Sequence, residues 1–199
     1  DANFKPNERV EASAVLTWDP ENGASFVTTG LRVDADHLNI PTDAFTAEAG
    51  YGFSFLARTG GHNETVEIDN IDLQKGWTNL DQLESYASSF DFDDGTTDLG
   101  DGSTISSDNG AAPASVQGGA LRMTTAENGG GGAAYVLPPN FDGSSGWTMS
   151  FDFVVEHTGG NTPADGFSIN YGAIPGADNY GAPAEEGYGV DVAHVSYQV

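Results

Sequence analysis

Alternation of apolar and polar residues is the clearest pattern along this chain. Segment 147–155 carries a large apolar side chain at every second position, and polar residues fill most of the positions between them. Segments 51–55 and 167–171 repeat the alternation, mainly with aromatic residues. Because successive side chains of a β-strand point to opposite faces, each of these segments is predicted to be a strand with one face in the core.

Weaker alternation predicts further strands at residues 12–18, 25–33, 120–124, 133–137 and 189–197. One more candidate, segment 66–73, changes its apolar side. Val66 and Ile68 fall on one face of an ideal strand, whereas Ile71 and Leu73 fall on the other. Since an extra residue shifts the alternation by one position, this strand is predicted to be bulged, or else buried on both faces.

Glycine and short polar residues separate the candidate strands, for example at Asn22-Gly23 and Asp142-Gly143. Such pairs favour tight turns. One stretch differs, because apolar residues between Leu80 and Phe90 recur at helical spacing, which predicts a short helix or an irregular connector. The sequence therefore predicts an all-β, two-sheet antiparallel sandwich with at most one short helix.

The composition supports this reading and narrows the choice of partners. The 199 residues include 27 glycines and no cysteine, which excludes disulfides and thiolate metal sites. Thirty acidic residues against six basic ones give a net charge of −24, which would repel nucleic acid and anionic membrane surfaces. No apolar run reaches the roughly 18 residues that a membrane span needs. We therefore expect no nucleic acid partner and no direct membrane insertion.

Four segments of the rear part resemble the first half of a known domain family. They are 90–95, 119–124, 147–155 and 164–169, the last reading Ala-Asp-Gly-Phe-Ser-Ile. The family is the concanavalin-A-like, or laminin-G-like, jelly-roll domains of bacterial surface proteins, related in fold to L-type lectins. Segments 53–61 and 68–73 resemble the second half of the same domain. The resemblance implies a jelly-roll sandwich and an extracellular or cell-surface location.

The two halves stand in reversed order along the chain. Residues 1–75 resemble the family's C-terminal half, 76–89 form a connector, and 90–199 resemble its N-terminal half. Neither half can bury both sheets alone, because a jelly roll interleaves strands from both ends of its sequence. Three arrangements remain open: assembly between chains, a segment cut out of phase from a tandem repeat, or closure of both halves within one chain.

A structural and adhesive role is the first functional hypothesis. The chain would be a surface module, part of a filament or of a long adhesin, completed by strands from copies of itself or from adjacent repeats. The alternative hypothesis is a self-contained, lectin-like module that binds carbohydrate.

The resemblance assigns the sugar site of this alternative. In L-type lectins the Asp of the Ala-Asp-Gly motif lies in the sugar pocket, which implies that role for Asp165, beside Gly166. A carboxylate suits sugars because it accepts hydrogen bonds from two adjacent hydroxyls. Tyr180 and Tyr188 are candidates for stacking on a sugar ring. The sequence departs from the lectin pattern at Val195, which stands where the family has a calcium-binding Asp.

A separate aspartate cluster is the candidate calcium site. It consists of Asp91, Asp93, Asp94, Asp98 and Asp101. Short carboxylates in a glycine-containing loop supply the hard oxygen ligands that calcium prefers. The spacing is not that of an EF-hand, since a glutamate at the twelfth loop position is lacking. Calcium is the one cofactor for which the sequence offers candidate ligands.

One acidic motif raises the question of catalysis. The segment from Glu67 to Asp72, Glu-Ile-Asp-Asn-Ile-Asp, resembles the Glu-x-Asp-x-x-Glu motif of laminarinase-like glycoside hydrolases, which implies a retaining pair at Glu67 and Asp69. The third acid is Asp72, one methylene shorter than the family's glutamate. The same segment also matches the closing strand of non-catalytic relatives. We therefore predict that the protein is not an enzyme.

Overall fold

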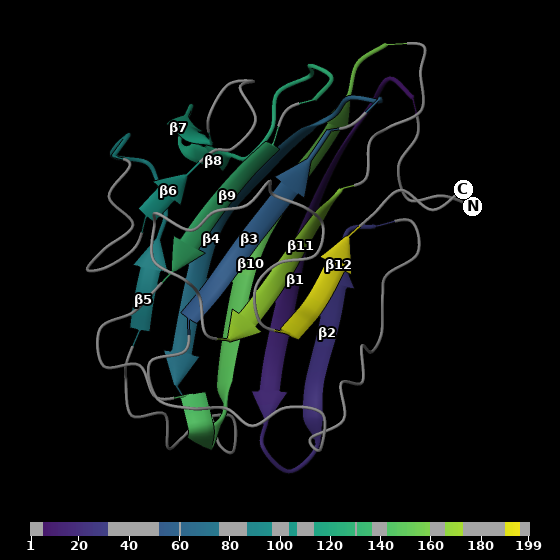
Figure 1. Ribbon diagram of the computed structural model, residues 1–199. Coiled ribbons are helices and arrows are strands. Elements are labelled where there is room, and N and C mark those ends of the chain that lie inside the picture. The colour runs from purple at the N-terminus through teal and green to yellow at the C-terminus, as the bar shows by residue number, and fades with distance from the viewer. Residues whose placement is uncertain are drawn as a thin grey trace.

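The structure is a computed structural model. It describes residues 6–31, 52–59, 61–75, 87–96, 104–106, 114–129, 131–136, 143–159, 166–172 and 190–195. Two antiparallel sheets, one of seven strands and one of five, pack face to face (Figure 1). The prediction of an all-β, two-sheet protein is confirmed. The described part of the chain contains no α-helix, and its one helical turn is the 3₁₀ segment η2 (Gly143–Ser145).

The larger sheet, called sheet A here, is built around three long strands. Its spatial order is β2 (Gly23–Thr29), β1 (Glu8–Asp19), β10 (Trp147–His157), β4 (Thr65–Lys75), β8 (Ala120–Arg122) and β7 (Ser115–Gln117), with β5 (Ala87–Phe90) also paired to β4. Sheet B has the order β12 (Val190–Val195), β11 (Phe167–Gly172), β3 (Gly52–Arg58), β9 (Gly131–Val136) and β6 (Thr104–Ser106). No helix among these described residues has the length and apolar character to span a membrane.

Aromatic side chains from the facing sides of the two sheets form the core. Every second residue of β10 from Trp147 to His157 is buried, as the alternation predicts. The Trp147 ring meets the Phe53 ring of β3 edge to face, with 4.7 Å between ring centroids. Phe153 and Phe167 join β10 to β11 in the same way at 5.2 Å. These contacts hold the two sheets together by apolar burial and ring packing.

Both sheets contain strands from the front and from the rear of the chain, and some of them are direct neighbours. In sheet A, β1 pairs with β10 from Glu8 opposite His157 to Trp18 opposite Trp147. Then β4 pairs with the other side of β10. In sheet B, β3 lies between β11 and β9. Both parts thus contribute to one core within a single chain.

Strand β4 is bulged, as one of the two sequence interpretations predicted. Its register against β10 shifts between Ser150 and Asp152, and Asn70 adopts a left-handed conformation with φ of 50°. The extra residue returns the apolar side chains to the core, so all four are buried: Val66, Ile68, Ile71 and Leu73. The three acids of this strand consequently share the outer face of sheet A.

The prediction of a short helix or irregular connector between Leu80 and Phe90 is wrong for the last four residues. Ala87–Phe90 form β5, which pairs with β4 from Ile71 to Gln74. Strand β8 pairs with β4 only at Glu67 and Ile68, so the rest of this edge needs another partner for its backbone groups. That demand outweighs the local helical spacing. Residues 80–86 lie outside the described part, and the acidic segment after Phe90 is a turn rather than a strand.

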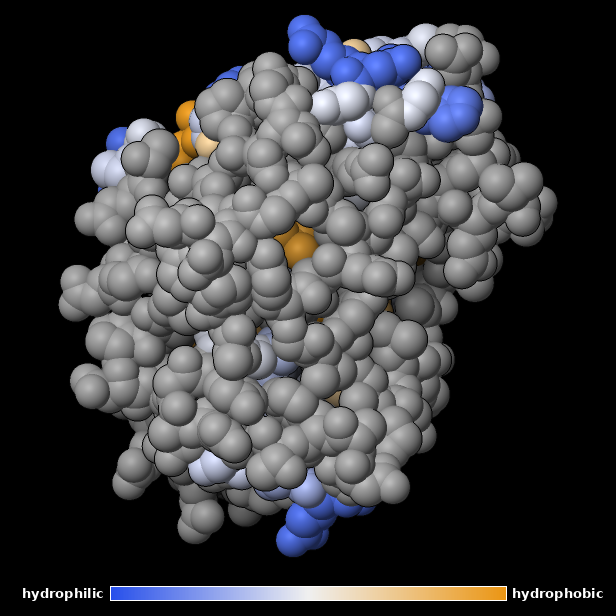
Figure 2. All heavy atoms as spheres, viewed as in Figure 1, coloured by the Kyte–Doolittle hydropathy of each residue, from blue (hydrophilic) through white to orange (hydrophobic). Residues whose placement is uncertain are grey.

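The outer faces of the two sheets differ in exposure. Ser54, Leu56 and Ser168 lie on the side of sheet B opposite the aromatic core, yet each is at most 2% exposed. On sheet A, Val15 and Val27 point outward and are 42% and 41% exposed. Seen from the side of sheet B, the described residues that reach the surface are mainly hydrophilic and gather at the two ends of the sandwich (Figure 2). The outer face of sheet A is therefore the open sheet surface.

Candidate functional site

A broad, open groove lies on the outer face of sheet A. Its volume is about 800 Å³, and residues of β1, β4, β8 and β10 line it together with the end of β2 and the β7–β8 turn. Its charged side chains are Arg9, Arg122, Glu11, Glu67, Asp69 and Asp152. They all project from paired strands, whose rigidity fixes the positions of their polar atoms.

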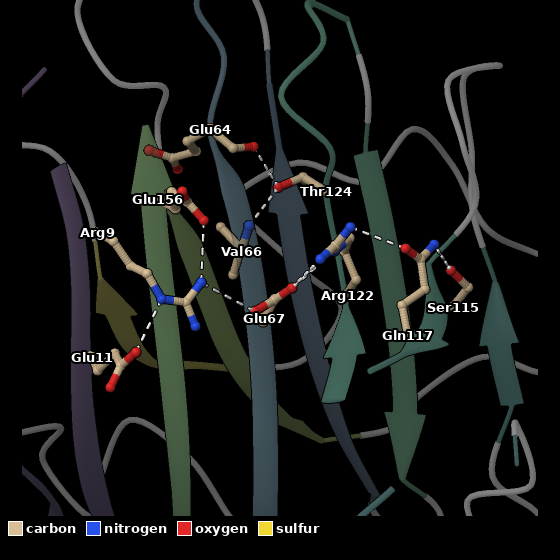
Figure 3. A network of polar contacts seen from close by, with 10 residues as sticks. All are labelled: Arg9, Glu11, Glu64, Val66, Glu67, Ser115, Gln117, Arg122, Thr124 and Glu156. Carbon is tan, nitrogen blue, oxygen red and sulfur yellow. Dashed lines mark hydrogen bonds and ion pairs between the residues drawn. The ribbon is translucent and has the colours of Figure 1, made fainter. Parts of the chain in front are cut away.

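A row of alternating charges crosses the groove, perpendicular to the strands (Figure 3). At its centre Glu67 of β4 lies between two guanidinium groups. Arg122 of β8 donates to Glu67 Oε1 from Nε at 2.9 Å and from Nη2 at 2.5 Å. Arg9 of β1 places Nη1 3.7 Å from Glu67 Oε2. With 8% of Glu67 exposed, these cations balance a largely buried carboxylate.

Further hydrogen bonds extend the row on both sides (Figure 3). Arg9 donates to Glu11 at 3.0 Å and to Glu156 at 3.1 Å. Its pKa lies above the ordinary arginine value, first because of the hydrogen bond to Glu11 and then because of Glu156 and the charge of Glu67. Arg122 Nη1 donates to Gln117 of β7 at 3.0 Å. The network therefore joins five strands of sheet A.

Two aspartates face each other beside this row. Asp69 of β4 pairs directly with Asp152 of β10 in the sheet register. Asp152 accepts hydrogen bonds from Ser13 Oγ at 2.6 Å and from Asn70 Nδ2 at 2.8 Å. The pKa of Asp69 is raised, first by burial and then by the charges of Asp93, Asp152 and Asp91. Neighbouring like charges on one sheet face are unfavourable, so this part of the groove is strongly electronegative.

The predicted sugar-site residues fall mostly outside the described part of the chain. Asp165, Tyr180 and Tyr188 lie there, so their role stays a prediction. Gly166 is described: it is buried and has a φ of 91° just before β11. Since that conformation favours glycine, Gly166 has a structural reason to be present.

The predicted calcium ligands are only partly described. Asp91, Asp93 and Asp94 are exposed in the turn after β5, whereas Asp98 and Asp101 lie outside the described residues. Asp94 Oδ1 accepts the Thr96 N–H at 2.9 Å, and this bond, followed by one from the Thr96 hydroxyl, lowers the Asp94 pKa. Where side chains are described, no three ligating groups converge as a metal site would require. Calcium binding at this loop stays a prediction.

The three acids of the β4 motif lie together on the outer face of sheet A. The bulge at Asn70 places Glu67, Asp69 and Asp72 on the outer face, as the hydrolase motif would need. A retaining hydrolase needs two carboxyl groups close to each other; here Glu67 forms an ion pair with Arg122, and Asp69 lies opposite Asp152. That the protein is not an enzyme stays a prediction.

The sequence interpretation did not identify Arg9 or Arg122 as site residues. Neither arginine belongs to a recognisable sequence motif. The small number of basic residues could have drawn attention to them, since they are two of only six in a chain of 199. Comparison with known proteins gives no assignment: no family model matches the sequence, and no curated protein is significantly similar to it.

Proposed function

We propose that the chain is a self-contained, extracellular glycan-binding module, with a concanavalin-A-like jelly roll whose halves are permuted. The observation that carries the proposal is the groove on the open face of sheet A. The interleaving of β1 and β4 with β10 supports the self-contained form, because it gives one chain a complete core. The family name rests on the sequence resemblance alone.

The polar groups of the groove match the chemistry of sugars. Carbohydrate hydroxyls donate and accept hydrogen bonds in closely spaced pairs, and carboxylates and guanidinium groups complement them. Asp69 and Asp152 supply acceptors on one side, and Arg9 supplies donors on the other. Because sheet strands hold these groups, little ordering would be needed on binding.

Glycan array binding followed by calorimetry tests the proposal. Asp69→Ala is expected to weaken binding of a glycan hit at least tenfold, since it removes an acceptor in the groove. Glu21→Ala, in the exposed β1–β2 turn, is the control and is expected to bind as the wild type does. A folded protein that binds no glycan contradicts the proposal. Loss of binding with Asp165→Ala but not with Asp69→Ala would move the site to the loop implied by the lectin resemblance.

Assembly through an edge strand is the second candidate function, in line with a structural and adhesive role. Strand β2 at the edge of sheet A has no charged residue and no proline, the two features that commonly protect sheet edges. Val27 of β2 lies opposite Val15 of β1, and both are exposed. A second copy adding along β2 would extend the sheet and place a strand beside Val27.

Light scattering at micromolar concentration tests this assembly. The wild type is expected to form oligomers that persist in salt, and Val27→Lys is expected to be monomeric. Gln74→Lys, on the outer face of β4, is the matched charge control and should still assemble. A monomeric wild type would contradict the assembly candidate and leave the glycan proposal standing.

A further inference from the structure

We infer that Glu67 is a specificity-determining residue that restricts the groove to uncharged glycans, by occupying the two arginines that would otherwise bind a carboxylated or sulfated sugar. The inference rests on the proposed glycan-binding function and adds the class of ligand. It follows from the hydrogen bonds of the two guanidinium groups, from the charge balance of the groove, and from the burial of Glu67.

Both guanidinium groups already have protein partners. Every nitrogen of Arg122 donates to the protein: Nε and Nη2 to Glu67, and Nη1 to Gln117. In Arg9, Nε donates to Glu11 and Nη1 to Glu156, while Nη1 also lies 3.7 Å from Glu67. Arginine recognises carboxylate and sulfate groups through paired N–H donors. Glu67 thus occupies the Nε–Nη2 edge of Arg122, which is one of the paired-donor edges that bind an anion, and the charge of Arg9 is shared among Glu11, Glu156 and Glu67.

The net charge of the lining opposes an anion as well. The two arginines face four carboxylates, those of Glu11, Glu67, Asp69 and Asp152. Around them the whole chain carries a charge of −24. An anionic sugar would therefore meet a net negative field in the groove, whereas a neutral sugar would not.

An anion cannot readily take the place of Glu67. Its carboxylate is largely buried in the network, and breaking such an ion pair leaves charges without partners. Glu67 thus acts as a built-in competitor for the arginines. A neutral glycan avoids the competition, because it can bond to Asp69 and to the outer N–H groups while the ion pairs stay intact.

Glu67→Gln is the sharpest test, since it keeps the side-chain length and removes the charge. Wild type and variant are compared on an array of neutral, uronate-bearing and sulfated glycans, and sodium glucuronate is titrated calorimetrically as a defined probe. The wild type is expected to bind neutral members only. The variant is expected to gain about tenfold in affinity for glucuronate at low salt and to lose the gain at high salt.

Two further variants keep the test decisive. Glu11→Gln removes a groove carboxylate that is 70% exposed, so it should fold normally and gain about threefold for glucuronate through Arg9. Glu21→Gln makes the same charge change outside the groove, so its affinity for glucuronate should rise less than that of Glu67→Gln or Glu11→Gln. Wild-type binding of uronate or sulfated glycans as tightly as neutral ones would overturn the inference but not the proposed function. Equal gains in all three variants would also overturn it, and binding of no glycan would overturn the proposed function itself.

Discussion

Two acidic side chains of β4 show how the surroundings of a residue decide its behaviour. Glu67 and Asp69 are two positions apart on the same strand face, yet Glu67 lies between guanidinium groups and Asp69 lies opposite Asp152. One carboxylate therefore has cations as neighbours, whereas the other has a like charge across the strand pair. The sequence shows both acids but cannot show which of them meets a cation.

Asp69→Asn is expected to stabilise the protein at pH 7. The pKa of Asp69 is raised above its ordinary value of 3.8, so its charged form opposes folding at neutral pH, and this opposition disappears as the pH falls through the raised pKa. The gain should be about 0.5 kcal/mol, as for other like-charge pairs on a sheet. Urea unfolding at pH 7 and pH 3 measures it, and a gain that is as large at pH 3 would rule out this electrostatic cause.

Because of the buried side chain of His157, at the end of β10, the protein is expected to lose stability as the pH falls. His157 is 2% exposed, its Nδ1 accepts the Asn7 N–H at 3.2 Å, and burial followed by the charge of His62 lowers its pKa below 6.5. As the pH falls below about 6.5, the unfolded chain takes up a proton before the folded chain does, so stability drops until the lowered pKa is passed. His157→Asn, which can still accept the hydrogen bond, is expected to show a smaller drop between pH 7 and pH 5. An identical pH profile for both proteins in thermal melts would contradict this assignment.

At the scale of elements, the predictable strands are those with a long alternating pattern. Strand β10 follows its pattern over its whole length, and the switch of apolar side in β4 correctly predicts a bulge. Strands β5, β6 and β7 have only three or four residues, too few to establish a period. They form because neighbouring strands offer unpaired backbone groups, which is a property of the folded sheet and not of the local sequence.

The bulge itself can be tested at Asn70, whose φ of 50° favours asparagine or glycine. Asn70→Val is expected to destabilise the protein by about 2 kcal/mol, because a β-branched residue is strained there and the hydrogen bond to Asp152 is lost. Asn70→Gly loses the same hydrogen bond without the strain, so it should cost about 1 kcal/mol less. Urea unfolding compares the two, and equal losses would argue against a strained bulge.

At the scale of the whole molecule, the sequence predicts that the front and the rear parts need each other, but not how they meet. Alternation identifies the buried faces of β1 and β10, whereas nothing local specifies that these strands are neighbours. The same limit explains why the groove could not be predicted from the sequence. Arg9 and Arg122 reach Glu67 only after β1, β10, β4 and β8 have been placed side by side, so the site is a product of long-range pairing.

The shared core predicts one cooperative unfolding transition for the entire domain. Trp18 from the front part and Trp147 from the rear part are direct partners in the β1–β10 ladder, and both are buried. Their fluorescence therefore reports the junction, while circular dichroism reports all strands, and the two urea midpoints should coincide. Trp77→Phe removes the third tryptophan and leaves a clean signal. Closure within one chain also requires a midpoint that does not change with protein concentration in Val27→Lys, the variant that blocks assembly along β2, because completion of the core by a second copy would raise the midpoint by mass action. Separate transitions would mean that each part keeps a core of its own, and a midpoint that rises in Val27→Lys would mean that the core is completed between chains.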